Sequence, residues 1–342
     1  MQRRDFLKAC LATTALSACA GPSATGVGDG PMIMTVNGPI SPEQMGATLP
    51  HEHVLVDFIG AAEVSPDRYD RDAVFRTVLP FVEQFRDLGG QTLVECTPAY
   101  LGRDPRLLKR LSEATGLHLL TNTGYYGARD DSYLPAHAFS DSADQLAARW
   151  VREWEEGIDG TGIRPGFMKI GVDSGSLSDV DRKLVQAAAR THLKTGLTIA
   201  AHTGPAVAAF EELDVLAREG VDPSAWIWVH AHAERDRMRN VEAARRGAWI
   251  EFDALSPIRS ERLVAFVLTM KEHGMLHRVL VSHDAGWYHV GEPDGGAFRP
   301  YDTMFSTFIP GLKNAGFTDA EIHQVLVTNP AEAFAVRVRS AS

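Results

Sequence analysis

Two histidines separated by one residue form the first motif that could carry chemistry. They lie in Pro50-His51-Glu52-His53, within the β-rich run 49–56. Side chains at alternate positions of a strand project from the same face, so both rings are expected to enter one interior. Imidazole nitrogen is a preferred ligand of zinc and related ions, although a single His-x-His pair is more often structural than metal-binding. The motif is therefore a candidate that needs further ligands.

Four more residues of suitable type stand at or just after the ends of β-rich runs. They are Lys169, His202, His230 and Asp284. Each alone is more often a structural or solvated side chain. Together with the first motif they give four histidines, one carboxylate and one lysine, a set that suits two divalent ions such as zinc. A lysine ammonium repels metals, but a neutral amine that has reacted with carbon dioxide becomes a carbamate, which can bridge two ions.

The elements that must position these residues alternate regularly between strand and helix. Eight β-rich runs are expected at 49–56, 92–96, 118–123, 166–170, 198–202, 226–230, 249–252 and 279–283. Helical periodicity marks 71–88, 105–115, 141–156, 178–195, 206–219, 235–246, 260–273 and about 319–327. This α/β pattern predicts a (β/α)8 TIM barrel, with all six candidates on its carboxyl-terminal rim. A doubly wound open sheet is the alternative, but no glycine-rich phosphate loop follows an early strand.

Composition narrows the class of protein. The 342 residues carry a formal net charge of −10, with 44% hydrophobic and 23% charged residues. This describes a globular protein and argues against a nucleic-acid partner, because such binding uses basic surfaces. Thirteen histidines against three cysteines favour a histidine-based metal site over a disulfide framework. The expected partner is a small-molecule substrate. A homodimer stays open, because no stretch reads as an interface.

The N-terminus reads as a targeting segment. Arg3-Arg4 precedes Phe6-Leu7-Lys8 and a short apolar run, which resembles a twin-arginine export signal. Leu16-Ser17-Ala18-Cys19 resembles a lipobox, in which Cys19 becomes the lipidated first residue. Ala18-Cys19-Ala20 also fits a cleavage site that would release a soluble protein. We therefore expect a signal peptide at 1–18, a flexible tether at 19–33 and a single catalytic domain at 34–342 that begins with a short β-hairpin. The expected location is the periplasm, with a lipid anchor at Cys19.

The motifs of residues 46–335 resemble the phosphotriesterase-like branch of the amidohydrolase superfamily. Besides 50–53, the matching motifs are Met168-Lys169-Ile170-Gly171, Ala201-His202-Thr203-Gly204 and Val281-Ser282-His283-Asp284. The resemblance implies that His51, His53 and Asp284 hold the buried metal and that His202 and His230 hold the more exposed one. It further implies that Lys169, as a carbamate, bridges the two ions with a hydroxide between them.

The resemblance also suggests a reaction. The bridging hydroxide would attack the substrate, and Asp284 would accept the proton of the nucleophile. Members that hydrolyse phosphotriesters carry an acidic residue and a histidine as an outward proton relay, where this chain has Ala233 and Ala254. We therefore expect a carboxylic ester or lactone as the substrate. A phosphotriesterase is the first alternative, and a non-catalytic zinc-binding lipoprotein is the alternative of another class. The role of His232, beside the strand-six ligand, stays open.

Loops after the strands should determine specificity. Tyr125 and Tyr126 follow the third strand, and related lactonases have a tyrosine near this place. Trp287 and Tyr288 begin the long segment 286–300, which reads as a mobile lid. All four are candidates for substrate binding. Arg259 or Arg299 could meet an anionic group, or either could be a solvated charge. Glu52 and His283 alternate with the expected ligands and should be structural.

Overall fold

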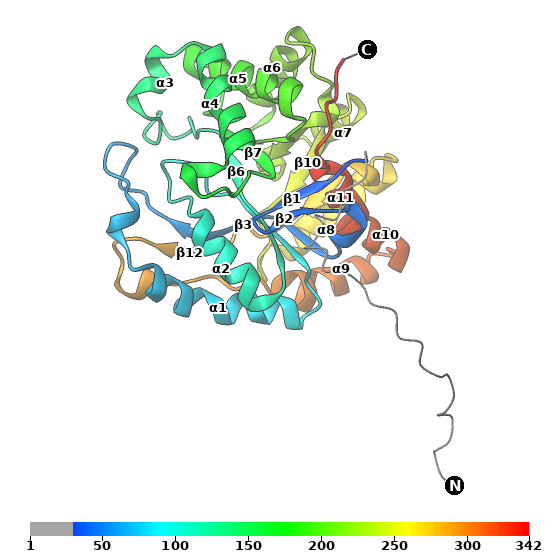
Figure 1. Cartoon of the computed structure of the whole chain (residues 1–342). Coiled ribbons are helices and arrows are strands. Elements are labelled where there is room, and N and C mark those ends of the chain that lie inside the picture. Colours follow the sequence, from blue (N-terminus) through cyan, green and yellow to red (C-terminus); the bar gives the residue numbers. More distant parts are fainter. Residues whose placement is uncertain (1–29, 342) are drawn as a thin grey trace, which may run out of the picture.

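The computed structural model describes residues 30–341 (Figure 1). The expected signal peptide, Cys19 and most of the expected tether lie outside these residues. The described part begins with a two-stranded antiparallel hairpin, β1 (Ile33–Thr35) and β2 (Gly38–Ile40). It turns at Asn37-Gly38, where Gly38 has a φ of +110° that favours glycine.

Parallel strands in chain order form the centre of the molecule. They are β3 (Thr48–Val56), β4 (Thr92–Glu95), β5 (His118–Leu120), β6 (Asn122–Thr123), β7 (Phe167–Gly171), β8 (Ile199–His202), β9 (Trp226–Val229), β10 (Trp249–Phe252) and β11 (Val279–Val281). The predicted third strand is present as β5 and β6, with Thr121 between them. Strands β6 to β11 pair in sequence order, and so do β3 to β5. This order is that of a (β/α)8 barrel, and the predicted fold class is confirmed.

The strand ladder is not continuous around the barrel. Strands β11 and β3 lie next to each other without a ladder between them. The Asp284 amide donates to the His51 carbonyl at 3.1 Å, and the His51 amide donates to Ser282 Oγ at 3.0 Å. Hydrogen bonds of His51 with Ser282 and Asp284 thus join the first strand to the segment after the last one, and two of these three residues are candidate ligands.

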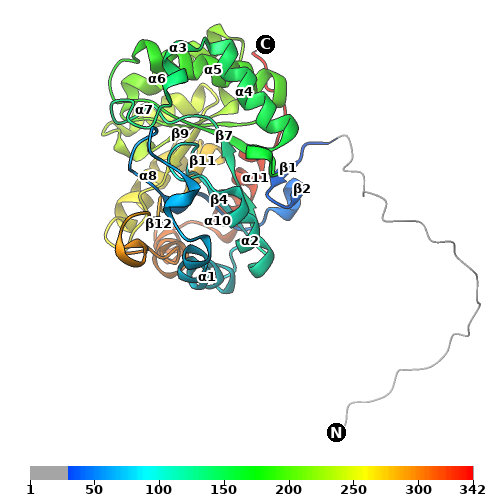
Figure 2. The same cartoon turned by 60° about the vertical axis from the view of Figure 1, so that its left-hand side comes forward.

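Helices surround the strands on all sides, as the two views show (Figures 1 and 2). The principal ones are α1 (Arg71–Asp87), α2 (Pro105–Thr115), α4 (Ala143–Glu156), α5 (Asp179–Thr195), α6 (Ala206–Arg218), α7 (Arg237–Arg245) and α8 (Ser260–Glu272). All seven lie within two residues of the predicted bounds. Local sequence explains this: for α2, the Asp104 side chain accepts a hydrogen bond from the Leu107 amide, Pro105 opens the helix and Gly116 ends it at a φ of +75°.

Shorter elements complete the chain. The remaining helices are α3 (Ala136–Ser140), α9 (Ile309–Asn314), α10 (Asp319–His323) and α11 (Asn329–Phe334), with π-helical turns at Met304–Phe308 and Gln324–Thr328. Short 3-10 turns occupy Pro42–Gln44, Pro66–Arg68, Ile158–Gly160, Pro223–Ala225, Ala231–Ala233, Leu276–Arg278 and Pro293–Gly295. No helix among residues 30–341 has both the length and the apolar character that a membrane crossing needs.

The barrel interior is filled rather than hollow. Val94, Phe167, Ile227, Trp249 and Leu280 form one buried apolar cluster together with residues of the hairpin and α11. Figures 1 and 2 both place the hairpin beside α11, so these two elements cover the amino-terminal end of the strands. The candidate ligands lie at the opposite end of the strands.

One predicted loop contains a strand. Residues 286–289 form β12 (Gly286–His289), which pairs in parallel with β3 through Gly286 opposite His53 and Tyr288 opposite Leu55. Gly286 has a φ of +88°, and a Cβ there would lie 1.8 Å from the His53 carbonyl oxygen. The first residues of the expected lid are thus paired with β3, and position 286 requires glycine because of this close approach.

Candidate metal centre

The six predicted ligands surround one cavity at the carboxyl-terminal end of the strands. Its lining includes His51, His53, Lys169, His202, His230 and Asp284. They come from β3, β7, β8 and the turns after β9 and β11, which are widely separated in sequence. The cavity has a volume of about 70 Å³, and the rest of its wall is mostly apolar. The expected convergence of these residue types therefore holds in space.

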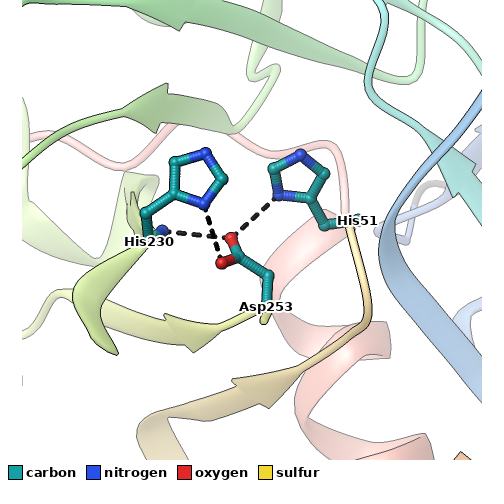
Figure 3. A group of neighbouring side chains, drawn as sticks. All are labelled: His51, His230 and Asp253. Carbon is teal, nitrogen blue, oxygen red and sulfur yellow. Dashed lines mark hydrogen bonds and ion pairs between the residues drawn. The ribbon is translucent and has the colours of Figure 1, made fainter. Parts of the chain in front are cut away.

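A buried carboxylate fixes two of the imidazole rings. Asp253, the residue after β10, lies between His51 and His230 (Figure 3). Its Oδ2 is 3.0 Å from Nδ1 of His51, and its Oδ1 is 2.8 Å from Nδ1 of His230. Asp253 also accepts the backbone amide of His230 at 3.0 Å. Asp253 thus orients both rings so that their Nε2 atoms face the cavity. Hydrogen bonds to Asp253 and Glu251 outweigh burial and raise the pKa of His51 to about 10, so a metal ion would have to displace a proton from its Nε2.

The ring of His53 is also oriented through a hydrogen bond at Nδ1, but its partner is the Thr97 hydroxyl. The Thr97 hydroxyl donates to the Leu55 carbonyl at 3.0 Å and lies 2.8 Å from Nδ1 of His53. Because this hydroxyl proton is already used, Thr97 must accept from Nδ1, which leaves Nε2 as the lone pair. That Nε2 is 3.1 Å from Oδ1 of Asp284. Three histidines therefore present the same ring nitrogen to the cavity.

Burial and charge set protonation states that suit a metal site. Burial lowers the pKa of His53 to about 4 and holds that of His202 well below its usual value. Both rings are neutral at pH 7 and can act as ligands. Burial alone would raise the pKa of Asp253, but the charge and hydrogen bonds of His230, His232 and His51 hold it well below its usual value. The carboxylate that orients the rings is thus ionised.

Lys169 has no acidic partner. Its side chain is 2% exposed, and Nζ lies 3.3 Å from Nε2 of His51. Among residues 30–341 no carboxylate oxygen lies within 4.0 Å of this amine. An unpaired buried ammonium is unfavourable, whereas a carbamate here would supply two oxygens among four imidazoles. The donor set fits two divalent ions in both number and type.

Backbone conformation turns two of the candidates inward. His230 has a φ of +62° and Asp284 a φ of +54°, both in the left-handed region that non-glycine residues seldom adopt. His230 directly follows β9 and Asp284 lies in the turn after β11, where continued extended backbone would carry each side chain elsewhere. Such conformations persist where surrounding structure requires them and are frequent at functional sites.

Sequence reasoning missed Asp253 and its neighbour Glu251. Both are buried, and Glu251 Oε2 lies 3.7 Å from Nδ1 of His51. A signal was present: two acids alternate in Trp249-Ile250-Glu251-Phe252-Asp253, an otherwise apolar strand. Alternate acids on a buried strand must face one interior, which marks a polar site. His232, whose role was open, is only partly exposed, with Nδ1 3.1 Å from Oδ1 of Asp253.

The four aromatic candidates divide into two pairs. Tyr126 and Trp287 line the cavity, and the Tyr126 hydroxyl lies 3.0 Å from Nδ1 of His202. Tyr125 does not line it: its hydroxyl lies 3.0 Å from Nε2 of His137, and its ring packs on Trp150. Tyr288 is also outside the lining, because it packs against the main apolar core, whereas Trp287 packs with Val56 and Leu101. Only one of each pair therefore lines the cavity.

Comparisons with known proteins identify relatives of this chain. A family model described as the phosphotriesterase family matches residues 31–334. A phosphotriesterase homology protein of Escherichia coli is 31% identical over 297 residues, covering 84% of this chain and 98% of that protein. An aryldialkylphosphatase of Saccharolobus solfataricus is 27% identical, covering 86% and 96%, and an N-acetyltaurine hydrolase of Rattus norvegicus is 27% identical, covering 87% and 96%. The solved organophosphorus hydrolase from Deinococcus radiodurans superposes with a TM-score of 0.80 at 29% identity, over 92% of this chain and 100% of that one.

Proposed function

This chain belongs to the phosphotriesterase family and is a hydrolase, and on that premise we propose that it uses two divalent metal ions to hydrolyse a carboxylic ester or a lactone. The observation that carries the proposal is the set of histidine rings that line one cavity around a buried lysine that lacks an acidic partner. Comparison with named hydrolases favours an enzyme over a non-catalytic zinc-binding lipoprotein.

The residues divide into two ligand groups. His51, His53 and Asp284 would hold one ion, and His202 with His230 would hold the other. Lys169, as a carbamate, would belong to both. When bound, two such ions acidify a shared water and polarise a carbonyl oxygen. Zinc is the proposed metal, since imidazole and carboxylate donors suit it.

The chain itself supplies proton handling and positioning. The pKa of the Asp284 carboxyl lies below its usual value, because His51, His53 and His230 together outweigh the effect of burial, so this group is ionised. It is partly exposed, so it can take a proton from the attacking water and release it toward solvent. Asp253 holds His51 and His230 in one tautomer throughout. Phe58, Leu101 and Trp287 form an apolar wall that excludes further water from the carbonyl.

Two observations bear on the choice between carbon and phosphorus esters. The positions that resemble the outward relay of phosphotriesterases are Ala233 and Ala254, which cannot transfer protons. This favours an ester or lactone. The contact between Asp253 and His232, however, supplies another polar route away from the ligands, so phosphotriester hydrolysis is the second candidate. A relative named aryldialkylphosphatase adds support to that second candidate.

Steady-state kinetics of the zinc-loaded protein test the proposal. We expect kcat/KM for an aryl ester and a γ-lactone to exceed that for a dialkyl aryl phosphate by roughly a hundredfold or more. Metal analysis should find about two ions per chain. A reversed order would make the phosphotriester the natural class. No hydrolysis of any of the three, at full metal content, would overturn the proposed activity.

Export and lipidation at Cys19 remain part of the proposal, because they concern residues outside 30–341. Incorporation of labelled palmitate into the full chain, compared with Cys19→Ser, tests them. Labelling of both proteins or of neither would contradict a lipid anchor at this residue.

A further inference from the structure

A second cavity opens beside the metal centre. It has a volume of about 280 Å³ and shares His230 and Asp284 with the lining of the first cavity. We call it the side cavity; the polar residues that line it and not the first cavity are His232, Ser256, Arg259, His283 and Arg299. A substrate whose carbonyl lies between the ligands has this space next to its reacting carbon.

Two arginines give the side cavity a positive charge. Arg259, in the turn before α8, has no carboxylate oxygen within 4.0 Å among residues 30–341, and its side chain is exposed. Arg299 donates from its guanidinium to the Asp284 carbonyl and lies 5.1 Å over the Trp287 ring. Neither charge is neutralised by an acid. Arg103, which lines another cavity, differs: Glu153 binds it through two hydrogen bonds of 2.8 and 2.7 Å.

A hydroxyl and an imidazole add neutral donors to the same wall. Ser256 Oγ is buried and has no hydrogen-bond partner in the described part of the chain. An unpaired buried hydroxyl is unfavourable, which indicates that a ligand atom completes it. The His232 ring meets Asp253 on one side and the side cavity on the other. Apart from Asp284, which belongs to the ligand set, no acidic residue lines this space.

The overall charge of the protein is opposite in sign to that of the side cavity. A chain with a net charge of −10 repels anions at long range, so an anionic substrate needs a local cationic site. Guanidinium groups bind carboxylate and other oxyanions in well-defined geometry, and removal from water strengthens the contact. The two arginines stand where such a group would arrive if its carbonyl lay at the ligands.

We propose that the side cavity binds an oxyanion group of the substrate, so that the natural substrate is an ester or lactone whose acyl part carries a carboxylate or sulfonate. This rests on the proposed function. Arg259 and Arg299 bind the oxyanion, Ser256 donates to it, and the scissile carbonyl is thereby placed beside Asp284.

A pair of matched esters tests this directly. Mono-4-nitrophenyl adipate and 4-nitrophenyl hexanoate have acyl chains of equal length and differ by the terminal carboxylate. With the zinc-loaded protein we expect kcat/KM to be about tenfold higher for the anionic ester. This ratio should fall to about one in Arg259→Gln/Arg299→Gln and stay unchanged in Arg245→Gln, which removes an exposed arginine of α7. An ester with a terminal sulfonate then shows which oxyanion is preferred.

A binding measurement separates this inference from the proposed activity. Free adipate should raise the unfolding midpoint of the zinc-loaded protein and of Arg245→Gln, but not that of the double variant. If neither ester is hydrolysed, the activity fails, and adipate binding that depends on the arginines still supports the side cavity. If both esters are hydrolysed at equal rates, or if the ratio survives in the double variant, the inference is overturned. Adipate binding of equal strength in all proteins would also overturn it.

Discussion

Alternate residues of the same two strand ends build two very different polar clusters. On the helix side of β3, both oxygens of Glu52 accept hydrogen bonds, from Ser282 Oγ at 2.7 Å and from the Ala285 amide at 2.8 Å among others. His283 closes this outer cluster, because Nδ1 lies 2.6 Å from Glu52 and Nε2 accepts the Met304 amide at 3.1 Å. On the barrel side, the inner cluster of His51, His53 and their partners directs its remaining lone pairs at one another.

The two clusters differ in whether their polar atoms all have hydrogen-bond partners, and not in burial or in residue type. Each cluster combines histidine and carboxylate, and each is almost fully buried. In the outer cluster every donor meets an acceptor, so it stabilises the fold and needs nothing else. In the inner cluster the Lys169 amine has no carboxylate partner and contacts Nε2 of His51 at 3.3 Å, so we propose that a bound cation completes the arrangement. On this proposal the outer cluster stabilises the fold and the inner cluster binds metal.

The largest expected effect comes from removing the inner lysine. Lys169→Ala should lower kcat/KM by roughly a thousandfold or more, because both ligand groups lose their shared member. Metal content measured by mass spectrometry should fall below about two ions per chain. Lys194→Ala, which removes an exposed lysine of α5, should change neither quantity. Full activity and full metal content in Lys169→Ala would end the binuclear mechanism.

Asp253 should show a smaller effect of the same kind. In Asp253→Asn, the amide nitrogen cannot accept a proton from a ring, so either His51 or His230 loses its fixed tautomer. Outer partners of this type contribute about 10- to 100-fold to metal affinity. Zinc competition with a chromophoric chelator measures the loss, and Asp87→Asn is the surface control. Unchanged affinity would show that Asp253 does not orient the ligands.

The sequence predicted the strands and the convergence of the six candidate ligands better than the partners of those residues. Strand runs and principal helices follow from local periodicity and capping, as in α2. Strand β12 was read as a lid, because Gly286-Trp287-Tyr288-His289 has no strand pattern and depends on pairing with β3, more than two hundred residues away. The choice between Tyr125 and Tyr126 is likewise set by which face the chain presents after β6.

The role of Asp253 also could not be predicted from local sequence. Alternation indicates that it faces the interior, but its role depends on two rings supplied by β3 and by the turn after β9. No local pattern contains that information, since the contacts join residues 202 and 23 positions apart. Residue types at strand ends thus predicted which side chains gather at one cavity, and only the assembled barrel shows which partners orient them.

The outer cluster should respond to mutation in stability and not in chemistry. Glu52→Gln keeps the shape but turns an amide NH2 toward the donors of Ser282, His283 and Ala285. We expect urea unfolding to show a loss of about 2 kcal/mol, the cost of leaving a buried polar group unsatisfied. Zinc affinity of the folded protein should change less than in Asp253→Asn, and Glu63→Gln serves as an exposed control. A larger loss of zinc than of stability would place Glu52 with the inner cluster.

A third buried carboxyl group, that of Glu212, tests the comparison through the pH dependence of stability. Glu212 of α6 is buried, and its partners are the neutral groups Thr203 Oγ1 at 2.6 Å and Trp226 Nε1 at 3.1 Å. With no histidine or arginine to offset burial, its pKa rises to about 8 from an ordinary 4.5. The native state then holds a proton that the unfolded chain releases, so stability is full below pH 4.5 and declines as the pH rises through 8.

Between pH 5.5 and 7.5 this group should lower the free energy of unfolding by about 1.4 kcal/mol per pH unit. Burial also raises the pKa of Glu95 to about 7, and Glu95 acts in the same direction, so the slope of the wild-type protein alone is not diagnostic. The measurement is the difference in slope between wild type and Glu212→Gln by urea unfolding at several pH values. Glu212→Gln should flatten the curve, because glutamine keeps the side-chain oxygen that accepts from Trp226 and has no proton to lose. Equal slopes would mean that Glu212 is ionised in the native state, and that neutral donors alone can saturate a buried carboxylate.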